Sequence, residues 1–416
     1  MTRSKIRRLI HNFPSLFYLL KWFIICLPIG AIVGSASAVF LLSLEWAGEF
    51  RDGHLWMIAL LPIGGLLVGG MYQLWGEGVV KGNNLLLEEF HSPKKIIPFK
   101  MAPLVLVGTV LTHLFGGSAG REGTAVQIGG AVADQFTKIF KLSKNDRKII
   151  ILVGVAAGFA SVFGTPLAGA VFALEVMVLG RIRLDAIVPS FMGAMLANFF
   201  CNLYPIHHTH YQMSEAALLT SLTPLNLLWA AVAGICFGLT AKLFSQTVHF
   251  IGDWFKAKIS MPMFRPVVGG VVLALAFFVV YQLTGETKYV GLGVPSIVQS
   301  FQQPMAGYDF ILKLLFTTFT LGCGFKGGEV TPLFFIGATL GNVLCWFIPL
   351  DMSLLAGMGF VGVFAGATNT PLACTLMGIE LFGIEGGCFI AMACGVAYLF
   401  SEHTGIYSAQ LVNGRK

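Results

Sequence analysis

Long apolar stretches separated by short polar segments run along almost the whole of this 416-residue chain. Five of them are long enough to cross a bilayer, which takes about 17–25 mostly apolar residues in a helix. These stretches are Phe17–Trp46, Trp56–Trp75, Ile149–Gly180, Asn226–Phe250 and Val267–Leu283. The pattern predicts an all-α protein that passes through a membrane several times.

Other apolar stretches are interrupted by glycine and proline. Residues Gly116–Gly130 include six glycines and Gly322–Gly328 include four, while Ser161–Pro166 and Ala365–Pro371 are short breaks between apolar halves. Broken backbone at membrane depth occurs only where protein buries it or where it lines a water-filled cavity. We therefore expect a bundle of many short, tilted and re-entrant helices, whose N-termini point inward and offer free N–H groups to an anion.

The composition supports membrane insertion and argues against nucleic acid as a partner. Hydrophobic residues make up 56% of the chain and charged residues 11%, whereas a soluble domain has about 25% charged residues. The net charge of +7 is spread over short segments that flank the apolar stretches. Short basic segments stay on the cytoplasmic side, so Arg3, Lys5, Arg7 and Arg8 predict a cytoplasmic N-terminus. The eight cysteines include no C-x-x-C pair and predict no disulfide or zinc framework.

The same pattern divides the chain into five parts. Residues 1–16 form a basic cytoplasmic segment, 17–203 a first membrane repeat, 204–224 a polar connector, 225–410 a second membrane repeat and 411–416 a short tail. The first apolar run lacks a clear small-residue cleavage site, so we expect a retained helix rather than a signal peptide. No soluble regulatory domain is expected after the second repeat.

Two motifs occur once in each predicted repeat. The pattern G-x-x-G-x-E-x-T covers Gly117–Thr124 and Gly324–Thr331, and T-P-L-A-x6-E covers Thr165–Glu175 and Thr370–Glu380. The copies are offset by 207 and 205 residues, which predicts a tandem duplication. In a membrane protein, paired segments that are broken by glycine and carry a carboxylate indicate a transport site between the repeats.

Glu122 is the first candidate for chemistry, because a carboxylate at mid-membrane costs about 2.5–3.5 kcal/mol. At the start of a predicted helix, free N–H groups would stabilise its ionised form, and its protonated form would release that position to an anion. The alternative is a helix-capping glutamate paired with Arg121. Glu329, in the second copy, either handles a proton as well or is an inherited duplicate that faces the cytoplasmic entrance, paired with Lys326.

Uncharged donors accompany the two carboxylates. Asn83 could donate an amide N–H to an anion or cap a helix. Tyr407 could donate its hydroxyl to an anion or anchor the chain at the membrane surface. The backbone N–H groups of Val330 and Thr331 lie at the start of a predicted helix with proline in its first turn, and they are further candidate donors.

Two other groups of polar residues have a plainer interpretation. Glu175 and Glu380 end the two T-P-L-A-x6-E motifs, and their matched places predict a structural or interface role. His207, His208 and His210 lie in the polar connector, where we expect them to be solvated rather than to bind a metal.

These residues resemble motifs of the CLC anion channels and proton-coupled anion exchangers, over nearly the whole chain. Gly120-Arg121-Glu122-Gly123 is similar to the family signature G-[KR]-E-G-P, with Thr124 in place of proline. In that family the glutamate is the external gate and the proton-transfer group, so the resemblance implies this role for Glu122. The resemblance implies a supporting role for Gly120, Arg121, Gly123 and Thr124.

Two further motifs of the family are recognisable. Tyr407 resembles the tyrosine that coordinates the central anion. Residues Gly328–Pro332 resemble G-x-F-x-P, whose backbone N–H groups line the anion site, with Val330 in place of phenylalanine. The resemblance implies a homodimer in which each subunit has its own pore and two halves of inverted topology, with broken helices that meet at a central anion site.

Three departures from the chloride-transporting members are informative. Asn83 stands in place of the chloride-coordinating serine of G-S-G-I-P, Val176 stands in place of the inner proton-transfer glutamate, and Glu329 adds a carboxylate to the second anion loop. This combination resembles the bacterial branch called CLC-F, whose members export fluoride in exchange for protons. The resemblance implies a multi-pass protein of a bacterial inner membrane that transports fluoride and protons and needs no cofactor.

Two alternatives stay open from the sequence. One is a chloride channel or chloride/proton exchanger of the same family with substituted site residues. The other, from a different class, is an intramembrane enzyme that uses Glu122 and Glu329 as an acid–base pair. The sequence offers no H-E-x-x-H motif for such an enzyme, so we expect a transporter without catalytic residues or a metal.

Overall fold

A computed structural model describes residues 14–402 and 404–412 of the chain. Most of the predicted basic segment 1–16 and of the predicted tail 411–416 lies outside these residues. The elements before the connector are α2 (Pro14–Gly53), η1 (Leu55–Leu60), α3 (Leu61–Trp75), α4 (Asn83–His91), α5 (Met101–Leu114), α6 (Glu122–Ile139), α7 (Lys144–Phe163), α8 (Pro166–Val176), β1 (Val178–Leu179), η2 (Leu184–Ala186) and α9 (Ile187–Cys201). Those that follow are α10 (Glu215–Leu218), α11 (Pro224–Lys258), η3 (Pro262–Phe264), α12 (Arg265–Thr284), α13 (Val294–Gln299), α14 (Asp309–Gly322), α15 (Val330–Leu344), α16 (Met352–Thr368), α17 (Pro371–Phe382), α18 (Gly387–Phe400) and β2 (Leu411–Val412).

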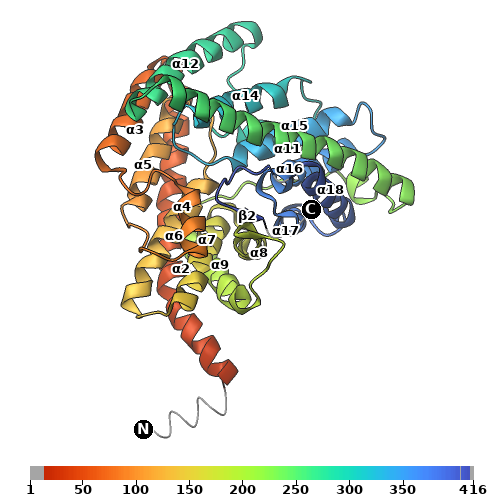
Figure 1. Cartoon of the computed structure of the whole chain (residues 1–416). Helices are drawn as coiled ribbons and strands as arrows, with labels where there is room; N and C mark the ends of the chain where they lie inside the picture. Colours follow the sequence, from red (N-terminus) through yellow and green to blue (C-terminus); the bar gives the residue numbers. More distant parts are fainter. Residues whose placement is uncertain (1–13, 403, 413–416) are drawn as a thin grey trace, which may run out of the picture.

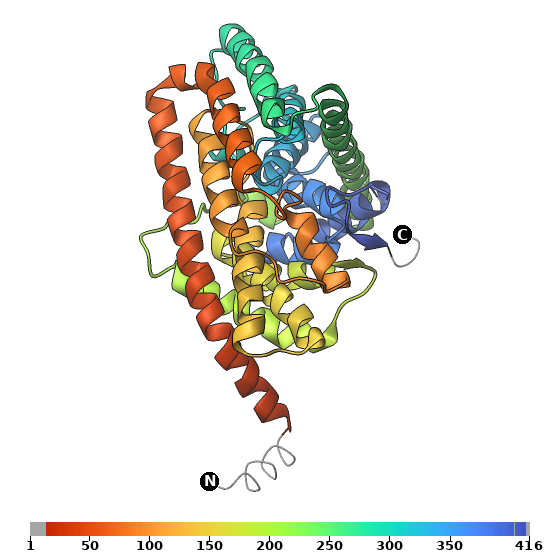
Figure 2. The same cartoon turned by 60° about the vertical axis from the view of Figure 1, so that its left-hand side comes forward.

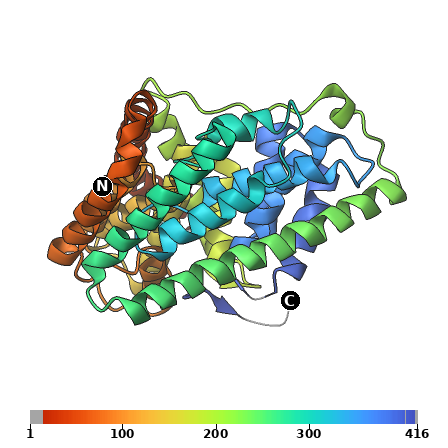
Figure 3. The same cartoon turned by 90° about the horizontal axis from the view of Figure 1, so that it is seen from above.

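The described chain is a bundle of helices, as expected, with one small exception. The two-residue strands β1 and β2 pair in parallel, Val178 with Leu411 and Leu179 with Val412. This pairing ties the end of the described chain to the segment after α8. Figure 1 shows the helices of the first half (red to yellow) on one side of the molecule and α15–α18 (blue) on the other. The long helices α2 and α11 lie at the outside, as Figures 2 and 3 show.

In the part of the chain that the structure describes, five helical segments are long and apolar enough to cross a membrane, and four of them correspond to predicted stretches. They are Ser15–Gly53, Leu55–Trp75, Leu184–Cys201, Pro224–Lys258 and Pro262–Thr284. The apolar stretch Ile149–Gly180 is divided between two helices, because Gly164 ends α7 at φ +75° and Pro166 begins α8. The break predicted at Ser161–Pro166 is thus confirmed, and the apolar segment at 184–201 was missed.

Corresponding helices pack against each other in the two halves of the chain. Helix α2 packs on α7 and α9 in the first half, and α11 packs on α16 and α18 in the second. A Cβ added at Gly129 in α6 would lie 2.0 Å from the Gly154 oxygen in α7, and one at Gly337 in α15 would lie 1.9 Å from the Gly359 oxygen in α16. Small residues let membrane helices approach closely. The two glycine contacts occupy corresponding places in the two halves, as expected if the halves arose by duplication.

Glu175 and Glu380 join the two halves by reciprocal helix caps. The Glu380 carboxylate at the end of α17 accepts the backbone N–H groups of Leu167 (2.9 Å) and Ala168 (2.7 Å) at the start of α8. The Glu175 carboxylate of α8 accepts those of Leu372 (3.1 Å) and Ala373 (2.9 Å) at the start of α17. Each helix end therefore lies beside the start of the other, so α8 and α17 run antiparallel. The two carboxylates satisfy N–H groups that a helix leaves free, which is the structural role predicted for them.

Candidate anion and proton site

The two glycine-rich loops of the duplicated motif meet at the centre of the molecule. Gly120 and Gly328 form an antiparallel bridge, with N–H to oxygen distances of 2.6 Å and 2.7 Å. Helix α14 holds the first loop, because Thr317 Oγ1 lies 2.9 Å from Ser118 Oγ and Thr320 Oγ1 accepts the Ser118 N–H at 3.3 Å. The bridge brings the N-termini of α6 and α15 together. Two sets of free N–H groups therefore point toward one place.

Glu122 begins α6 but binds the other half of the molecule. Its side chain is 0% exposed. The Thr331 N–H, at the start of α15, donates to Glu122 Oε2 at 3.0 Å, and the Thr331 hydroxyl lies 2.6 Å from Oε1 and 2.7 Å from Oε2. The Arg121 N–H donates to Oε2 and its Nε to Oε1, both at 3.2 Å. The carboxylate therefore occupies the place at a helix N-terminus that suits an anion.

Two supporting residues allow this close packing. A Cβ added at Gly123 would lie 3.1 Å from both Asn83 Nδ2 and Glu329 Oε2, so only glycine leaves these two side chains room beside Glu122. The Thr124 hydroxyl lies 2.7 Å from that of Thr109, which holds α6 against α5. The predicted residues Asn83 and Glu329 are thus neighbours of the loop that carries Glu122.

Asn83, Glu329 and Tyr407 line a single cavity of about 170 Å³, here called the polar cavity. Asn83 is 8% exposed and Tyr407 6%. In the described part of the chain, Glu329 Oε2 and Asn83 Oδ1 are buried without a hydrogen-bond partner. A buried polar atom of this kind is open to bind an ion, a water molecule or a proton. The tertiary structure thus brings together three predicted residues from distant parts of the chain.

Tyr407 is held in place by the backbone on both sides of it. The Ile406 N–H donates to the Ala367 oxygen at 2.9 Å, and the Ala409 N–H donates to Asn84 Oδ1 at 2.9 Å. The segment after α18 is therefore fastened both to α16 and to the start of α4. This places Tyr407 inside the protein, and the alternative of a surface anchor was wrong.

Val176 lies beside the same residues. A small cavity of about 10 Å³, room for one water, is lined by Val176 together with Asn83 and Tyr407. The position at which the resemblance expects a glutamate in chloride exchangers thus carries an apolar side chain here. Among the described residues that line the polar cavity, Glu329 is the carboxylate.

Arg121 lines a second cavity, of about 400 Å³, here called the vestibule. Glu45 and Glu49 of α2 and His207 of the connector also line it. The neighbouring His208 contacts Asn202 Oδ1 at 3.2 Å, and burial lowers the pKa of its imidazole to about 4. His208 is therefore neutral near pH 7. Glu122 thus lies between Arg121, which lines the vestibule, and Gly123, which adjoins the polar cavity.

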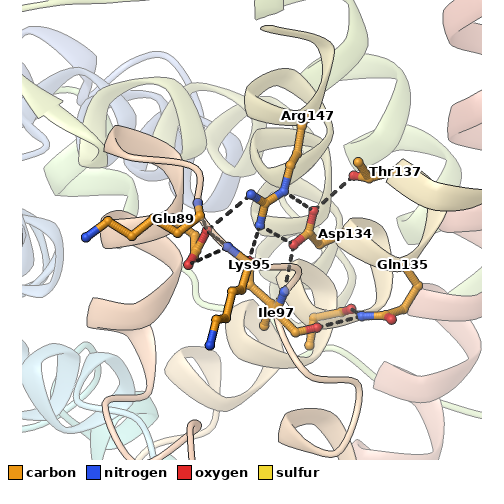
Figure 4. A network of polar contacts seen from close by, with 9 residues as sticks. Glu89, Lys95, Ile97, Asp134, Gln135, Thr137 and Arg147 are labelled. Atoms are coloured by element: carbon orange, nitrogen blue, oxygen red, sulfur yellow. Dashed lines mark hydrogen bonds and ion pairs between the residues drawn. The ribbon is translucent and has the colours of Figure 1, made fainter. Parts of the chain in front are cut away.

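A buried ion-pair network fixes the helix that carries Asn83 (Figure 4). Arg147 of α7 donates to Asp134 of α6 from Nε (2.8 Å) and Nη2 (2.7 Å), and its Nη1 lies 3.1 Å from Glu89 Oε2. Glu89 is in α4, whose first residue is Asn83. Arg147 Nη2 also donates to the Lys95 oxygen at 2.6 Å, in the segment that follows α4. Sequence reasoning missed this network, because its members are not part of a recurring motif.

The predicted alternative of an ion pair between Glu329 and Lys326 is not found among the described residues. Lys326 Nζ instead lies 4.2 Å from the centre of the Tyr72 ring. The segment Gly116–Gly120 matches the G-x-S-x-G spacing of a hydrolase nucleophile, but Ser118 is buried against Thr317, as described above. In the described geometry the hydrogen-bond partner of this serine hydroxyl is therefore another hydroxyl, that of Thr317.

Duplicated halves, broken helices that meet inside the bundle and a carboxylate at a helix N-terminus define a membrane transport protein with an anion site. Residues 64–402 match the family model for the voltage gated chloride channel. The chain therefore belongs to this family, the CLC proteins, and is a multi-pass membrane protein. The family resemblance found in the motifs is confirmed.

Individual relatives agree with this assignment. A chloride/fluoride channel protein from Pseudomonas syringae pv. tomato is 50% identical over 419 residues, which cover 99% of this chain and 91% of that protein. The crystal structure of a CLC-type fluoride/proton antiporter has a TM-score of 0.90 and 35% identity, covering 96% of this chain and 100% of the other. A slow cyanobacterial Cl⁻/H⁺ antiporter has a TM-score of 0.76 at 20% identity, covering 91% and 94%, and supports the fold alone.

Proposed function

We propose that this protein is a fluoride/proton antiporter that exports fluoride, with Glu122 as its gate and proton-transfer group. The observation that carries the proposal is the Glu122 carboxylate bound by the Thr331 N–H and hydroxyl at the start of α15. These donors bind whichever anion is present, so an ionised Glu122 and a fluoride ion compete for them. The two similar proteins described above, a chloride/fluoride channel protein and a fluoride/proton antiporter, support fluoride as the anion.

The proposed cycle follows from this competition. A proton from the vestibule neutralises Glu122, which then loses its attraction to the α15 N-terminus. Fluoride from the polar cavity takes the vacated donors, with further hydrogen bonds from Asn83 and Tyr407. Fluoride is a small anion with a strong hydration shell, and several converging donors offset the loss of that shell. Glu122 then passes its proton to Glu329 and on to the polar cavity, and the returning carboxylate displaces the fluoride toward the vestibule.

The orientation in the membrane is part of the proposal. Basic residues cluster between α4 and α5 and around the turn between α6 and α7, and we place them on the cytoplasmic side with the N-terminus. They are Lys94, Lys95, Lys100, Lys138, Lys141, Lys144 and Lys148. Helix α4 itself begins at Asn83 in the polar cavity. Fluoride would then enter from the polar cavity and leave through the vestibule, while protons move the other way. We also propose a homodimer with one pore in each subunit.

The direct test is transport by the purified protein in liposomes loaded with fluoride or chloride, recorded with fluoride, chloride and pH electrodes. We expect fluoride efflux with proportional proton uptake and little chloride movement. Chloride efflux at a comparable rate would favour the alternative of a chloride channel or exchanger. An unchanged anion gradient would contradict anion transport of either kind and would favour the enzyme alternative.

We expect Asn83→Ser to shift selectivity toward chloride. The amide has a donor at Nδ2 beside Gly123, and serine is shorter, so the substitution enlarges the site and removes one hydrogen-bonding group. The ratio of fluoride to chloride efflux should fall by about tenfold, the effect of one lost hydrogen bond to a charged group. The same liposomes give both rates. An unchanged ratio would take Asn83 out of the selectivity argument.

We expect Glu329→Gln to lower the number of protons taken up per fluoride ion. Glu329 Oε2 is buried without a partner among the described residues, so protonation is the simplest way for this carboxylate to exist there. A positioned side chain accelerates a proton-transfer step by about 10²–10⁴-fold. Loss of the Glu329 carboxylate should therefore appear as weaker coupling between proton uptake and fluoride efflux. If coupling stays intact and only the apparent fluoride affinity changes, Glu329 tunes the anion site instead.

A further inference from the structure

We propose that Lys326 and Tyr72 form a docking site for fluoride in the polar cavity, which takes up the ion before it reaches Glu122. This inference rests on the proposed fluoride transport and adds a binding residue to it. Lys326 lies in the second glycine-rich loop, three residues before Glu329, and both side chains line the polar cavity. Tyr72 belongs to α3 and lines the same cavity.

The ammonium group of Lys326 is held by an aromatic ring. Its Nζ lies 4.2 Å from the centre of the Tyr72 ring, well within the range of a cation–π contact. Among the described residues, Lys326 makes no ion pair with a carboxylate. The second lysine of the cavity, Lys81, differs in this respect, because its Nζ lies 2.7 Å from Glu88 Oε2 and its side chain is 62% exposed. The polar cavity therefore contains one lysine charge that is neutralised and one that is not.

The backbone of α5 makes room for this lysine. A Cβ added at Gly108 would lie 3.1 Å from Lys326 Cβ and 3.2 Å from Cγ. The aliphatic part of the side chain is thus packed closely against α5, while the charged end projects toward Tyr72. This packing fixes the ammonium group on the wall of the cavity, which a freely moving lysine would not do.

The chemistry of the pair suits a small, hard anion. A ring face attracts an ammonium group without supplying a strong acceptor for its three N–H donors. Those donors stay available to fluoride, which is a stronger acceptor than the ring. Asn83, Gln127 and Tyr407 line the same cavity and offer uncharged donors beside the ammonium. An unpaired cation in a narrow cavity also raises the local concentration of anions.

The test compares matched lysine variants in the liposome assay. The initial rate of fluoride efflux is measured against the fluoride concentration on the side of the polar cavity. For Lys326→Gln we expect KM to rise about tenfold, equivalent to 1.4 kcal/mol of binding, with the maximal rate changed by less than about threefold. Lys81→Gln is the control, and because its charge is already paired we expect KM to change by less than about twofold. Lys326→Arg should retain a KM near that of the unchanged protein.

Removal of the ring gives a second, independent measurement. Tyr72→Leu takes away the cation–π contact but leaves the lysine, and titration calorimetry with sodium fluoride should show weaker binding in both Tyr72→Leu and Lys326→Gln. An unchanged KM and unchanged fluoride binding in Lys326→Gln would overturn the docking site. A lower maximal rate at constant KM would overturn it as well, since that result indicates a purely structural lysine. Absence of fluoride transport by the unchanged protein would instead contradict the proposed function.

Discussion

Replacement of Glu122 by glutamine is expected to abolish proton uptake during fluoride efflux. Glutamine has nearly the shape of glutamate and keeps an oxygen that can accept from the Thr331 N–H, which donates at 3.0 Å in the structure. It cannot take up and release a proton, so the group that links the two ions is lost. Because a positioned proton-transfer group contributes about 10²–10⁴-fold, proton uptake should fall at least about a hundredfold. Simultaneous fluoride and pH recordings from the same liposomes measure this.

Glu175→Gln is the matched control for this variant. Glu175 is also a carboxylate inside the bundle, but it accepts the N–H groups of Leu372 and Ala373, and glutamine keeps one acceptor oxygen for that cap. Its proton-to-fluoride ratio should stay close to that of the unchanged protein. Normal coupling in Glu122→Gln would contradict the gate assignment. Loss of coupling in both variants would show that replacing any buried carboxylate disturbs proton coupling. That result would contradict a specific proton-transfer role for Glu122.

The second large effect is expected on stability, from Arg147→Met. The side chain of Asp134 is 0% exposed, that of Arg147 8% and that of Glu89 11%. Methionine fills a similar volume but leaves two buried carboxylates without their guanidinium partner. Removal of one partner from a buried ion pair costs about 3–5 kcal/mol. We therefore expect a markedly lower unfolding temperature in detergent, and a lower fluoride-to-chloride ratio because α4 holds Asn83.

Arg183→Met controls for the loss of an arginine as such. Arg183 pairs with Asp185, but its side chain is 28% exposed and that of its partner 53%. A surface pair of this kind contributes about 0–1 kcal/mol, so the unfolding temperature should hardly move. If Arg147→Met and Arg183→Met unfold at the same temperature, the network around Arg147 does not hold the helix that carries Asn83.

Several parts of the site were predictable from local sequence. The breaks between α5 and α6 (115–121) and between α14 and α15 (323–329) follow from glycine, and the start of α15 follows from Pro332 in its first turn. The duplicated motif identified Glu122 and Glu329 as a related pair before any contact was known. Asn83 and Tyr407 depended on the family resemblance, because a single asparagine or tyrosine has no distinctive local pattern.

Elsewhere two local signals competed. The stretch 149–180 is apolar apart from a few positions such as Glu175, and hydropathy averaged over it favours one span, whereas its glycine and proline predict a break. Gly164 and Pro166 end one helix and begin the next, because their backbone preferences act on single residues while hydropathy averages over many. The segment at 184–201 was missed for the opposite reason, since its apolar residues begin only after the charged residues Arg183 and Asp185.

By itself, the sequence determined that this is a duplicated, multi-pass helical protein of the CLC family with carboxylates in segments broken by glycine. These properties depend on hydropathy and on short motifs, which involve residues close together in the sequence. Only the tertiary structure decided what each carboxylate touches. Glu122 and Thr331 are 209 positions apart, and Glu380 and Leu167 are 213 apart. The contact of Lys326 with Tyr72 and that of Arg147 with Glu89 likewise join different helices. Such contacts depend on how helices distant in the sequence pack, and no local pattern predicts which partner that packing brings to a buried polar group.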